Sequence, residues 1–326
     1  MFYLTFNEQP SGVYSSQVTD VVSYIRQNDL ARMRLVAFIS LRGFSENRKR
    51  ILSEAPGSWV IPIFPRGTQR WFSTVVLWLL CLFTGERSIL CRNVSACMMA
   101  LQVRRSGIKL RIGYDGRGAI AAEWNEYDVV PSEKQKREIA SLEKQAVLES
   151  DFRIAVSQKL VEYWQQQYGY KGTEHTVIPC TVTSTFTPGL PAESELSAIR
   201  ASFGFTPADL VLVYSGSTAG WQSFGTLEKL LADCLRSSPD VKLIFLTGKD
   251  PVVEKMKTDH PGQVQSRWLK HHEVTGMLLA CDIGILYREQ SVTNKVASPT
   301  KFAEYLSAGL PVVISEGLGD YSRFVE

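Results

Sequence analysis

The chain has 326 residues, of which 44% are hydrophobic, and a formal net charge of +3. So small a positive excess does not suggest nucleic-acid binding, which requires a concentrated basic surface. The length favours two domains, each large enough for its own hydrophobic core. Met1 leads straight into FYLTF with no basic segment before it, so we predict no signal peptide and a cytoplasmic protein.

The cysteine and histidine patterns do not indicate a metal centre. The six cysteines form no CxxC pair and most lie in apolar runs, so we interpret them as reduced core residues. His271 and His272 are adjacent, but neighbours in sequence rarely converge on one ion, and no third ligand is evident. The sequence therefore predicts no metal site.

The first residues have the pattern with which doubly wound α/β domains begin. Residues 2–6 predict a strand, a turn containing Ser11 and Gly12 follows, and a helix is expected from near Ser15. Its apolar residues recur at helical spacing: Val18, Val21, Val22 and Ile25. Gly12 permits close approach of the backbone to a ligand, although an isolated glycine is more simply part of the turn.

The remainder of the first half continues this alternation. Strands are predicted at 35–39, 59–63, 88–91, 109–114 and 152–156, and helices from about 94, over 132–150 and over 157–168. The run 71–83, WFSTVVLWLLCLF, is too short for a bilayer span of roughly 20 residues, so we predict a core helix. The alternative is a membrane-facing helix, since Arg66 and Arg70 precede it.

The segment YDGRGAIAAEW follows the strand at 109–114 and carries a loose dinucleotide fingerprint, G-x-G-x-x-A, at Gly116, Gly118 and Ala121. We give it little weight, because it lies in mid-domain and Arg117 stands where a pyrophosphate would pack against backbone. A nicotinamide oxidoreductase nevertheless remains an open alternative. Asp115 and Arg117 lie at a strand's carboxyl end, where open α/β sheets place ligands.

A segment rich in threonine and proline, with Pro179, Pro188 and Pro191, indicates a linker. We predict domains at 1–182 and 183–326. The second half repeats the rhythm, with strands at 210–214, 241–247 and 283–287 and helices at 226–237 and 273–280. The loop SGSTAGWQSFG after the first of these strands offers donors from Gly216 and Ser217.

The segment SPTKFAEYLSAGLPVVIS predicts a capped helix followed by a buried strand at 310–315. Ser298 is the expected N-cap, Pro299 the first helical residue and Gly309 the left-handed terminator. Free backbone N–H groups at the start of the helix, with Thr300 and Lys301, suit a phosphate.

One turn further along this helix, Glu304 shares a face with Thr300 and Lys301, and its carboxylate can accept hydrogen bonds from sugar hydroxyls. A phosphate end and a hydroxyl acceptor together suggest a nucleotide ribose. The plainer interpretation is an ordinary α/β helix with a solvated polar face.

The same segment resembles the donor site of GT-B glycosyltransferases, particularly the retaining group called family 4. The segment SGVYSSQVTDVV resembles the first loop of these enzymes, which faces the interdomain cleft, so Ser11 and Gly12 are candidate residues of the cleft loop. The resemblance implies two facing Rossmann-like domains and a nucleotide-sugar donor used without metal or cofactor. It also implies a saccharide or lipid-linked hydroxyl acceptor bound mainly by the first domain, at the inner face of the membrane or in the cytoplasm.

The resemblance assigns roles to individual residues. Asp115, Arg117 and Glu123 resemble a D-x-R-G…E segment facing the cleft, so Asp115 and Arg117 are catalytic candidates. The helix start is expected to hold the donor diphosphate and Glu304 the ribose. The predicted donor-binding residues are Gly216, Ser217, Lys249, Ser298, Thr300, Lys301 and Glu304.

Three departures limit the resemblance. The glycine loop lacks the Arg and Lys that neutralise the diphosphate in many relatives, and Val296 stands where the first of two glutamates is expected, so Glu289 is the candidate substitute. Relatives also continue beyond the position of Glu326, so we predict an incomplete second domain. A non-catalytic sugar-nucleotide binder therefore stays open as an alternative.

Overall fold

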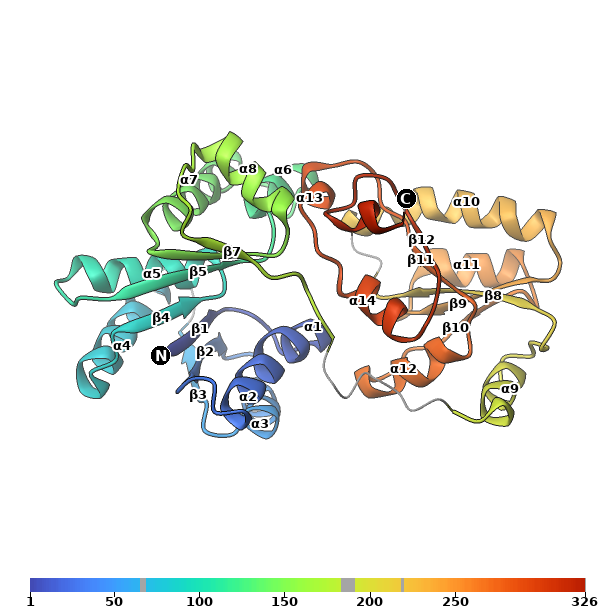
Figure 1. Cartoon of the computed structure of the whole chain (residues 1–326), viewed down its shortest axis with the longest axis horizontal. Helices are drawn as coiled ribbons and strands as arrows, with labels where there is room; N and C mark the ends of the chain where they lie inside the picture. Colours follow the sequence, from blue (N-terminus) through green and yellow to red (C-terminus); the bar gives the residue numbers. More distant parts are fainter. Residues whose placement is uncertain (65–68, 183–190, 218–219, 326) are drawn as a thin grey trace. The chain divides into compact units, whose positions relative to one another are not determined.

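The computed structural model describes residues 1–64, 69–182, 191–217 and 220–325. The chain divides into two compact units, Met1–Pro179 and Cys180–Glu326, and each is built around one parallel sheet (Figure 1). The two-unit α/β architecture is as the sequence predicts. The middle of the expected linker, 183–190, lies outside the described residues.

The N-terminal unit contains a seven-stranded parallel sheet in the order β3-β2-β1-β4-β5-β6-β7. Its strands are β1 (Phe2–Phe6), β2 (Arg34–Ser40), β3 (Trp59–Ile63), β4 (Ser88–Cys91), β5 (Arg111–Gly116), β6 (Phe152–Ala155) and β7 (His175–Val177). Its helices are α1 (Gly12–Tyr14), α2 (Asp20–Gln27), α3 (Phe44–Glu54), α4 (Gln69–Thr84), α5 (Val94–Arg105), α6 (Ile120–Glu126), α7 (Glu133–Glu149) and α8 (Gln158–Tyr168), with a π-helical stretch Ser15–Thr19 joining α1 to α2.

The C-terminal unit contains a five-stranded parallel sheet in the order β10-β9-β8-β11-β12. Its strands are β8 (Leu210–Ser215), β9 (Val241–Leu246), β10 (Val264–Ser266), β11 (Ile283–Leu286) and β12 (Val312–Ile314). Its helices are α9 (Glu193–Ala201), α10 (Phe224–Ser237), α11 (Pro251–Asp259), α12 (His271–Leu279), α13 (Val292–Lys295) and α14 (Thr300–Ser307), with 3₁₀ turns at Gly220–Gln222 and Tyr321–Phe324.

The hydrophobic patterns explain why these elements form. The interior strand β2 is buried over Leu35–Ile39, as expected for a parallel strand covered on both faces. Val18 and Val22 pack with Ile51 of α3 against the sheet, whereas Val21 is exposed. The first helix begins earlier than predicted, at Gly12, because the Ser11 hydroxyl caps it by accepting a hydrogen bond from the Tyr14 N–H.

Each sheet has one switch point. It lies between two adjacent parallel strands whose connections to the next strand lead toward opposite edges of the sheet. In the N-terminal unit this point lies between β1 and β4, and in the C-terminal unit between β8 and β11. Open α/β sheets bind ligands outside the carboxyl ends of the strands at such points. Each unit therefore has one expected ligand position.

Helix α4 is only partly the core helix that the sequence predicts. Leu77 and Cys81 are fully buried, but Trp71 is 69% and Phe83 85% exposed. No described helix is long and apolar enough to cross a membrane. All six cysteines are free thiols as predicted, and five are buried, but Cys234 is exposed rather than in the core.

Candidate functional site

Lys301, a lysine of helix α14, lies close to the carboxyl end of β8. Gly216, which follows β8, has φ +130°, and a Cβ atom there would lie 2.3 Å from Cε of Lys301. Lys301 is the second residue of α14, and the end of its side chain lies against Gly216. The backbone conformation favours glycine at this position, and a larger residue would also displace the end of the Lys301 side chain.

The ammonium of Lys301 is buried among neutral partners. Its Nζ donates a hydrogen bond to Oε1 of Gln222 at 3.0 Å and lies 4.3 Å from the ring centroid of Tyr214. Desolvation, and then the nearby Arg288 guanidinium, lower the pKa of Lys301 to about 7, while Glu304 acts in the opposite direction. The interpretation of Lys301 as part of a solvated face is therefore wrong.

Glu304 lies on the same helix and is also buried, with 9% of its surface exposed. Burial raises its pKa, and Lys301 partly counteracts the rise. Among the described residues none donates a hydrogen bond to this carboxylate, and no ion pair joins it to Lys301. A buried carboxylate with open acceptor positions is suited to hydroxyl groups of a ligand.

The start of α14 differs from the prediction. The N-cap residue is Pro299, not Ser298, and Thr300 is the first helical residue. The Ser298 hydroxyl instead accepts a hydrogen bond from the Cys180 N–H at 2.8 Å and lies 2.7 Å from the Tyr321 hydroxyl. Ser298 thus links Cys180, at the start of the C-terminal unit, to Tyr321, near the end of that unit. The predicted terminator is correct, since Gly309 has φ +73°.

The other predicted residues of this unit lie around the same sheet edge. Ser217 and Lys249 are exposed beyond β8 and β9. Glu289 follows β11 and is also exposed, and its carboxylate accepts a hydrogen bond from the Thr226 hydroxyl of α10. Val296, where the first family glutamate is expected, is buried.

Arg288 is a residue that sequence reasoning missed. It lies two residues beyond the end of β11 at the switch point, it is 8% exposed, and its Nη1 lies 3.3 Å from Oδ1 of Asn294. Its charge influences the pKa of both Lys301 and Tyr214. The signal that could have identified Arg288 in the sequence is a basic residue immediately after the apolar strand predicted at 283–287.

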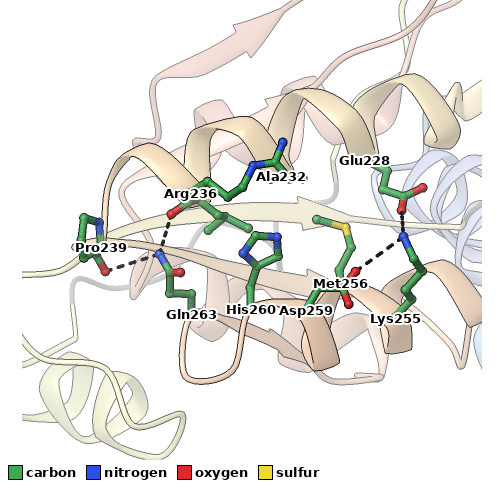
Figure 2. A pocket seen from close by; sticks show the side chains of 10 residues that line it. Glu228, Ala232, Arg236, Pro239, Lys255, Met256, Asp259, His260 and Gln263 are labelled. Carbon is green, nitrogen blue, oxygen red and sulfur yellow. Dashed lines mark hydrogen bonds and ion pairs between the residues drawn. The ribbon is translucent and has the colours of Figure 1, made fainter.

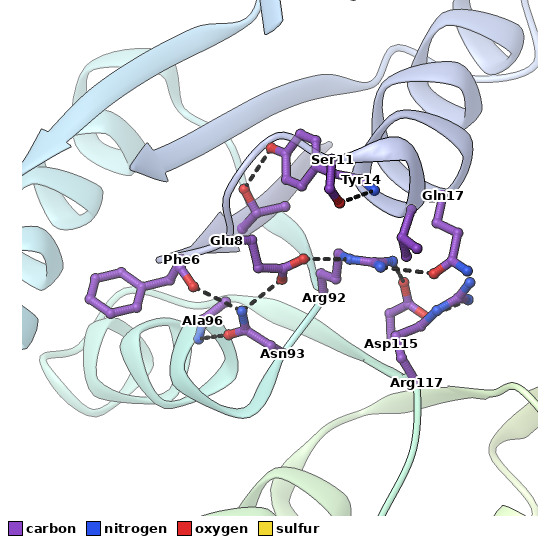
Figure 3. A network of polar contacts seen from close by, with 12 residues as sticks. Phe6, Glu8, Ser11, Tyr14, Gln17, Arg92, Asn93, Ala96, Asp115 and Arg117 are labelled. Carbon is purple, nitrogen blue, oxygen red and sulfur yellow. Dashed lines mark hydrogen bonds and ion pairs between the residues drawn. The ribbon is translucent and has the colours of Figure 1, made fainter. Parts of the chain in front are cut away.

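The switch point of the N-terminal unit holds a buried network of charged groups (Figure 3). Arg92, which follows β4, donates from Nε to Glu8 and from Nη2 to Gln17, each at 2.8 Å. Its Nη1 lies 3.9 Å from Asp115 and has no hydrogen-bond partner among the described residues. Asp115 itself accepts from the Tyr3 hydroxyl at 2.7 Å.

The two predicted catalytic residues, Asp115 and Arg117, both belong to this network, and they differ in how accessible they are. Asp115 is 4% exposed and also accepts from Nη1 of Arg117 at 3.2 Å. Arg117 is the more accessible partner, with 22% of its side chain exposed. At the neighbouring helix start, Ser11 and Gly12 are exposed, and Gly12 has neither a left-handed φ nor a crowded Cβ position. The fold itself therefore does not require glycine at position 12.

The structure argues against dinucleotide binding at Gly116–Ala121. The buried Glu143 carboxylate accepts hydrogen bonds from the N–H groups of Ile120 and Ala121, at 3.3 and 2.9 Å, and burial raises its pKa to about 7. These are the amides that a pyrophosphate would need. A Cβ at Gly116 would lie 2.5 Å from Trp164, so this glycine accommodates the core.

Two further features lie apart from these positions. The described residues contain no cluster of three potential metal ligands, and the side chains of His271 and His272 lie outside the described part. A cavity of about 420 Å³ lies between α10 and α11 (Figure 2). It is lined in part by Lys255, His260 and Gln263, and it contains none of the predicted donor-binding residues.

No family model and no curated protein matches the sequence. The structure of HepE from Anabaena in complex with UDP matches with a TM-score of 0.70 at 14% identity, over 100% of this chain and 82% of that one. The chain has the GT-B fold. Sucrose-phosphate synthase from Thermosynechococcus elongatus, another GT-B neighbour, matches with a TM-score of 0.67 at 14% identity, over 100% of this chain and 83% of that one.

The GT-B fold is not restricted to one reaction. A Listeria monocytogenes protein assigned as a UDP-N-acetylglucosamine 2-epimerase matches with a TM-score of 0.59 at 11% identity, over 99% of this chain and 80% of that one. At such identities the likeness concerns the fold, so the reaction must be argued from the site.

Proposed function

We propose that this chain is a retaining family 4 glycosyltransferase that moves a sugar from a nucleotide-sugar donor to a hydroxyl of a saccharide or lipid-linked acceptor, in cell-surface polysaccharide or glycolipid synthesis. The observation that carries the proposal is the pair of buried, oppositely charged side chains on α14, Lys301 and Glu304, of which Lys301 lies against Gly216 at the β8/β11 switch point. The retaining outcome comes from the family resemblance.

The proposed chemistry requires stabilisation of a leaving diphosphate. Preorganised donors in a site that excludes water are suited to such developing charge. Lys301 and the positive end of the α14 helix dipole are suited to this charge, and Arg288 adds positive charge nearby. The Gly216 N–H is not available, because it donates to the Leu246 carbonyl at 3.0 Å. Lys301 and Arg288 together take the place of the basic pair that the glycine loop lacks. Glu289 and Arg117 remain the proposed contacts to the transferred sugar and to the acceptor.

A binding screen followed by product analysis tests the proposal. One of the UDP-, GDP-, ADP- or dTDP-sugars is expected to raise the melting temperature, because ligand binding stabilises the native state. HepE binds UDP, so UDP-sugars are screened first. Release of nucleoside diphosphate with transfer of the sugar to an added acceptor supports the proposal. Binding without turnover would indicate the non-catalytic binder, and an epimerised sugar nucleotide would indicate an epimerase.

Helix α4 provides a surface for a lipid-linked acceptor. Residues 71–84 contain no charged side chain, and Trp71, Leu79, Leu82 and Phe83 are all exposed. At the end of the helix, Arg87 and Arg111 are exposed and adjacent, since the Arg111 N–H donates to the Arg87 carbonyl at 2.7 Å. Exposed aromatic residues beside positive charge suit an anionic membrane surface.

We therefore expect the double variant Trp71→Ser with Phe83→Ser to bind anionic vesicles at least tenfold more weakly than the wild type. Each large apolar side chain contributes about 1.5–3 kcal/mol when fully buried. Sedimentation with phosphatidylglycerol vesicles measures the effect. The control removes two exposed leucines from other helices, Leu148→Ser with Leu230→Ser. Equal losses in both double variants, or no vesicle binding by the wild type, would contradict a membrane contact through α4.

A further inference from the structure

The buried ammonium of Lys301 lacks a counter-ion. No described carboxylate lies within 4.0 Å of its Nζ, although the side chain is nine-tenths buried or more. Its close partners are the Gln222 carbonyl oxygen and the Tyr214 ring. Burying a charge without a paired opposite charge is costly, and an amide oxygen and an aromatic face offset only part of that cost.

The groups that face Lys301 come from four elements. Gln222 belongs to the 3₁₀ turn after β8, and Tyr214 belongs to β8 itself. Arg288 follows β11 and repels the ammonium, while Glu304 of α14 attracts it from beyond ion-pair distance. The net environment is therefore deficient in negative charge, beside a left-handed glycine and the start of a helix.

We propose that Gln222 is a positioning residue that holds the Lys301 ammonium beside Gly216, and that the diphosphate of the donor is the counter-ion which this ammonium lacks. The inference rests on the proposed function and adds a property to it. Because Gln222 is neutral, it orients Lys301 without neutralising it. A carboxylate at position 222 would compete with the donor for the same charge.

This arrangement couples donor binding to proton uptake. The pKa of Lys301 is lowered to about 7 in the free protein, and a bound diphosphate raises it because an opposite charge favours the ammonium. At a pH between the pKa of Lys301 in the free protein and its pKa in the complex, Lys301 takes up close to one proton for each nucleotide bound. The affinity should accordingly fall as the pH rises above 7, by up to about tenfold per pH unit.

Titration calorimetry with UDP tests the proposal on the full chain. Measurements at pH 8 in two buffers of different ionisation enthalpy give the number of protons taken up. Above pH 7.5 the phosphates of UDP are already ionised, since the second phosphate pKa is about 6. The uptake is then assigned to the protein, and the same titrations from pH 7 to 9 give the slope of affinity against pH.

Two substitutions of Gln222 are expected to move the pH profile in opposite directions. Gln222→Glu pairs Lys301 in the free protein, so proton uptake disappears and UDP binds at least tenfold more weakly at pH 7. Gln222→Met removes the oxygen that supports the ammonium, so the fall in affinity begins at a lower pH than in the wild type. Gln27→Glu, an exposed position of α2 in the other unit, adds the same charge and should leave the profile unchanged.

The outcomes separate this inference from the proposed function. UDP binding whose affinity does not change between pH 7 and 9, or a Gln222→Glu variant that keeps the wild-type profile, overturns the role of Gln222 and leaves a nucleotide site intact. Failure of every screened nucleotide to bind overturns both. A merely structural role for Gln222 would lower stability in both variants without shifting the pH dependence, and this result also overturns the proposal.

Discussion

Glu304→Ala is expected to weaken nucleotide binding by well over tenfold. The Glu304 carboxylate is buried, and among the described residues it accepts no side-chain or backbone hydrogen bond, so its acceptor positions are open to a ligand. Two ribose hydroxyls donating to a carboxylate contribute on the order of 2–4 kcal/mol, from about 1.5–3 kcal/mol for each charged hydrogen bond less the cost of desolvation. Isothermal titration calorimetry with UDP measures the loss.

The matched control is Glu254→Ala, which removes an exposed glutamate from α11 of the same unit. Its affinity for UDP should equal that of the wild type. Glu304→Ala also removes a buried charge, so the free protein should remain folded and need not lose stability. Wild-type affinity in the folded Glu304→Ala variant would remove Glu304 from the nucleotide site and would leave α14 as an ordinary helix.

Asp115→Asn is expected to destabilise the N-terminal unit. Asp115 lies beside Arg92, which is 6% exposed, and it also accepts from Tyr3 and Arg117. Arg92 keeps its ion pair with Glu8, so the loss comes from the weakened hydrogen bonds of Tyr3 and Arg117 and the lost charge, about 1–3 kcal/mol. Chemical denaturation followed by the fluorescence of the tryptophans should show the N-terminal unit unfolding at lower denaturant concentration, while UDP binding by the C-terminal unit persists.

Asp128→Asn makes the same change on the surface of the same unit, where Asp128 pairs with Lys136, and it should have little effect on stability. The sequence alone assigns Asp115 a role at the acceptor. If Asp115→Asn folds as stably as Asp128→Asn but abolishes sugar transfer, that catalytic role is correct and the structural one is wrong. Arg117, the more exposed partner, is then the next residue to substitute.

Local patterns in the sequence were sufficient for most of the fold. The helix over α14, its left-handed end at Gly309 and the caps of α7 and α8 depend on residues within a few positions of one another, so capping and periodicity predict them. The edge strands β7 and β10 were missed, because each has only three residues and no clear alternation. Lys301 and Glu304 were found together, because one helical turn separates them.

What only the tertiary structure decided is which distant residues share a site. Lys301 lies against Gly216, and Arg288 acts on Lys301, because β8 pairs with β11 and α14 follows them. Asp115 meets Tyr3 and Arg92 because β1, β4 and β5 are neighbours in the sheet. Burial then changed the role that we infer for these residues. A lysine or an aspartate looks solvated in a sequence, and only the packing around it determines its charge, its partners and the ligand that it can accept.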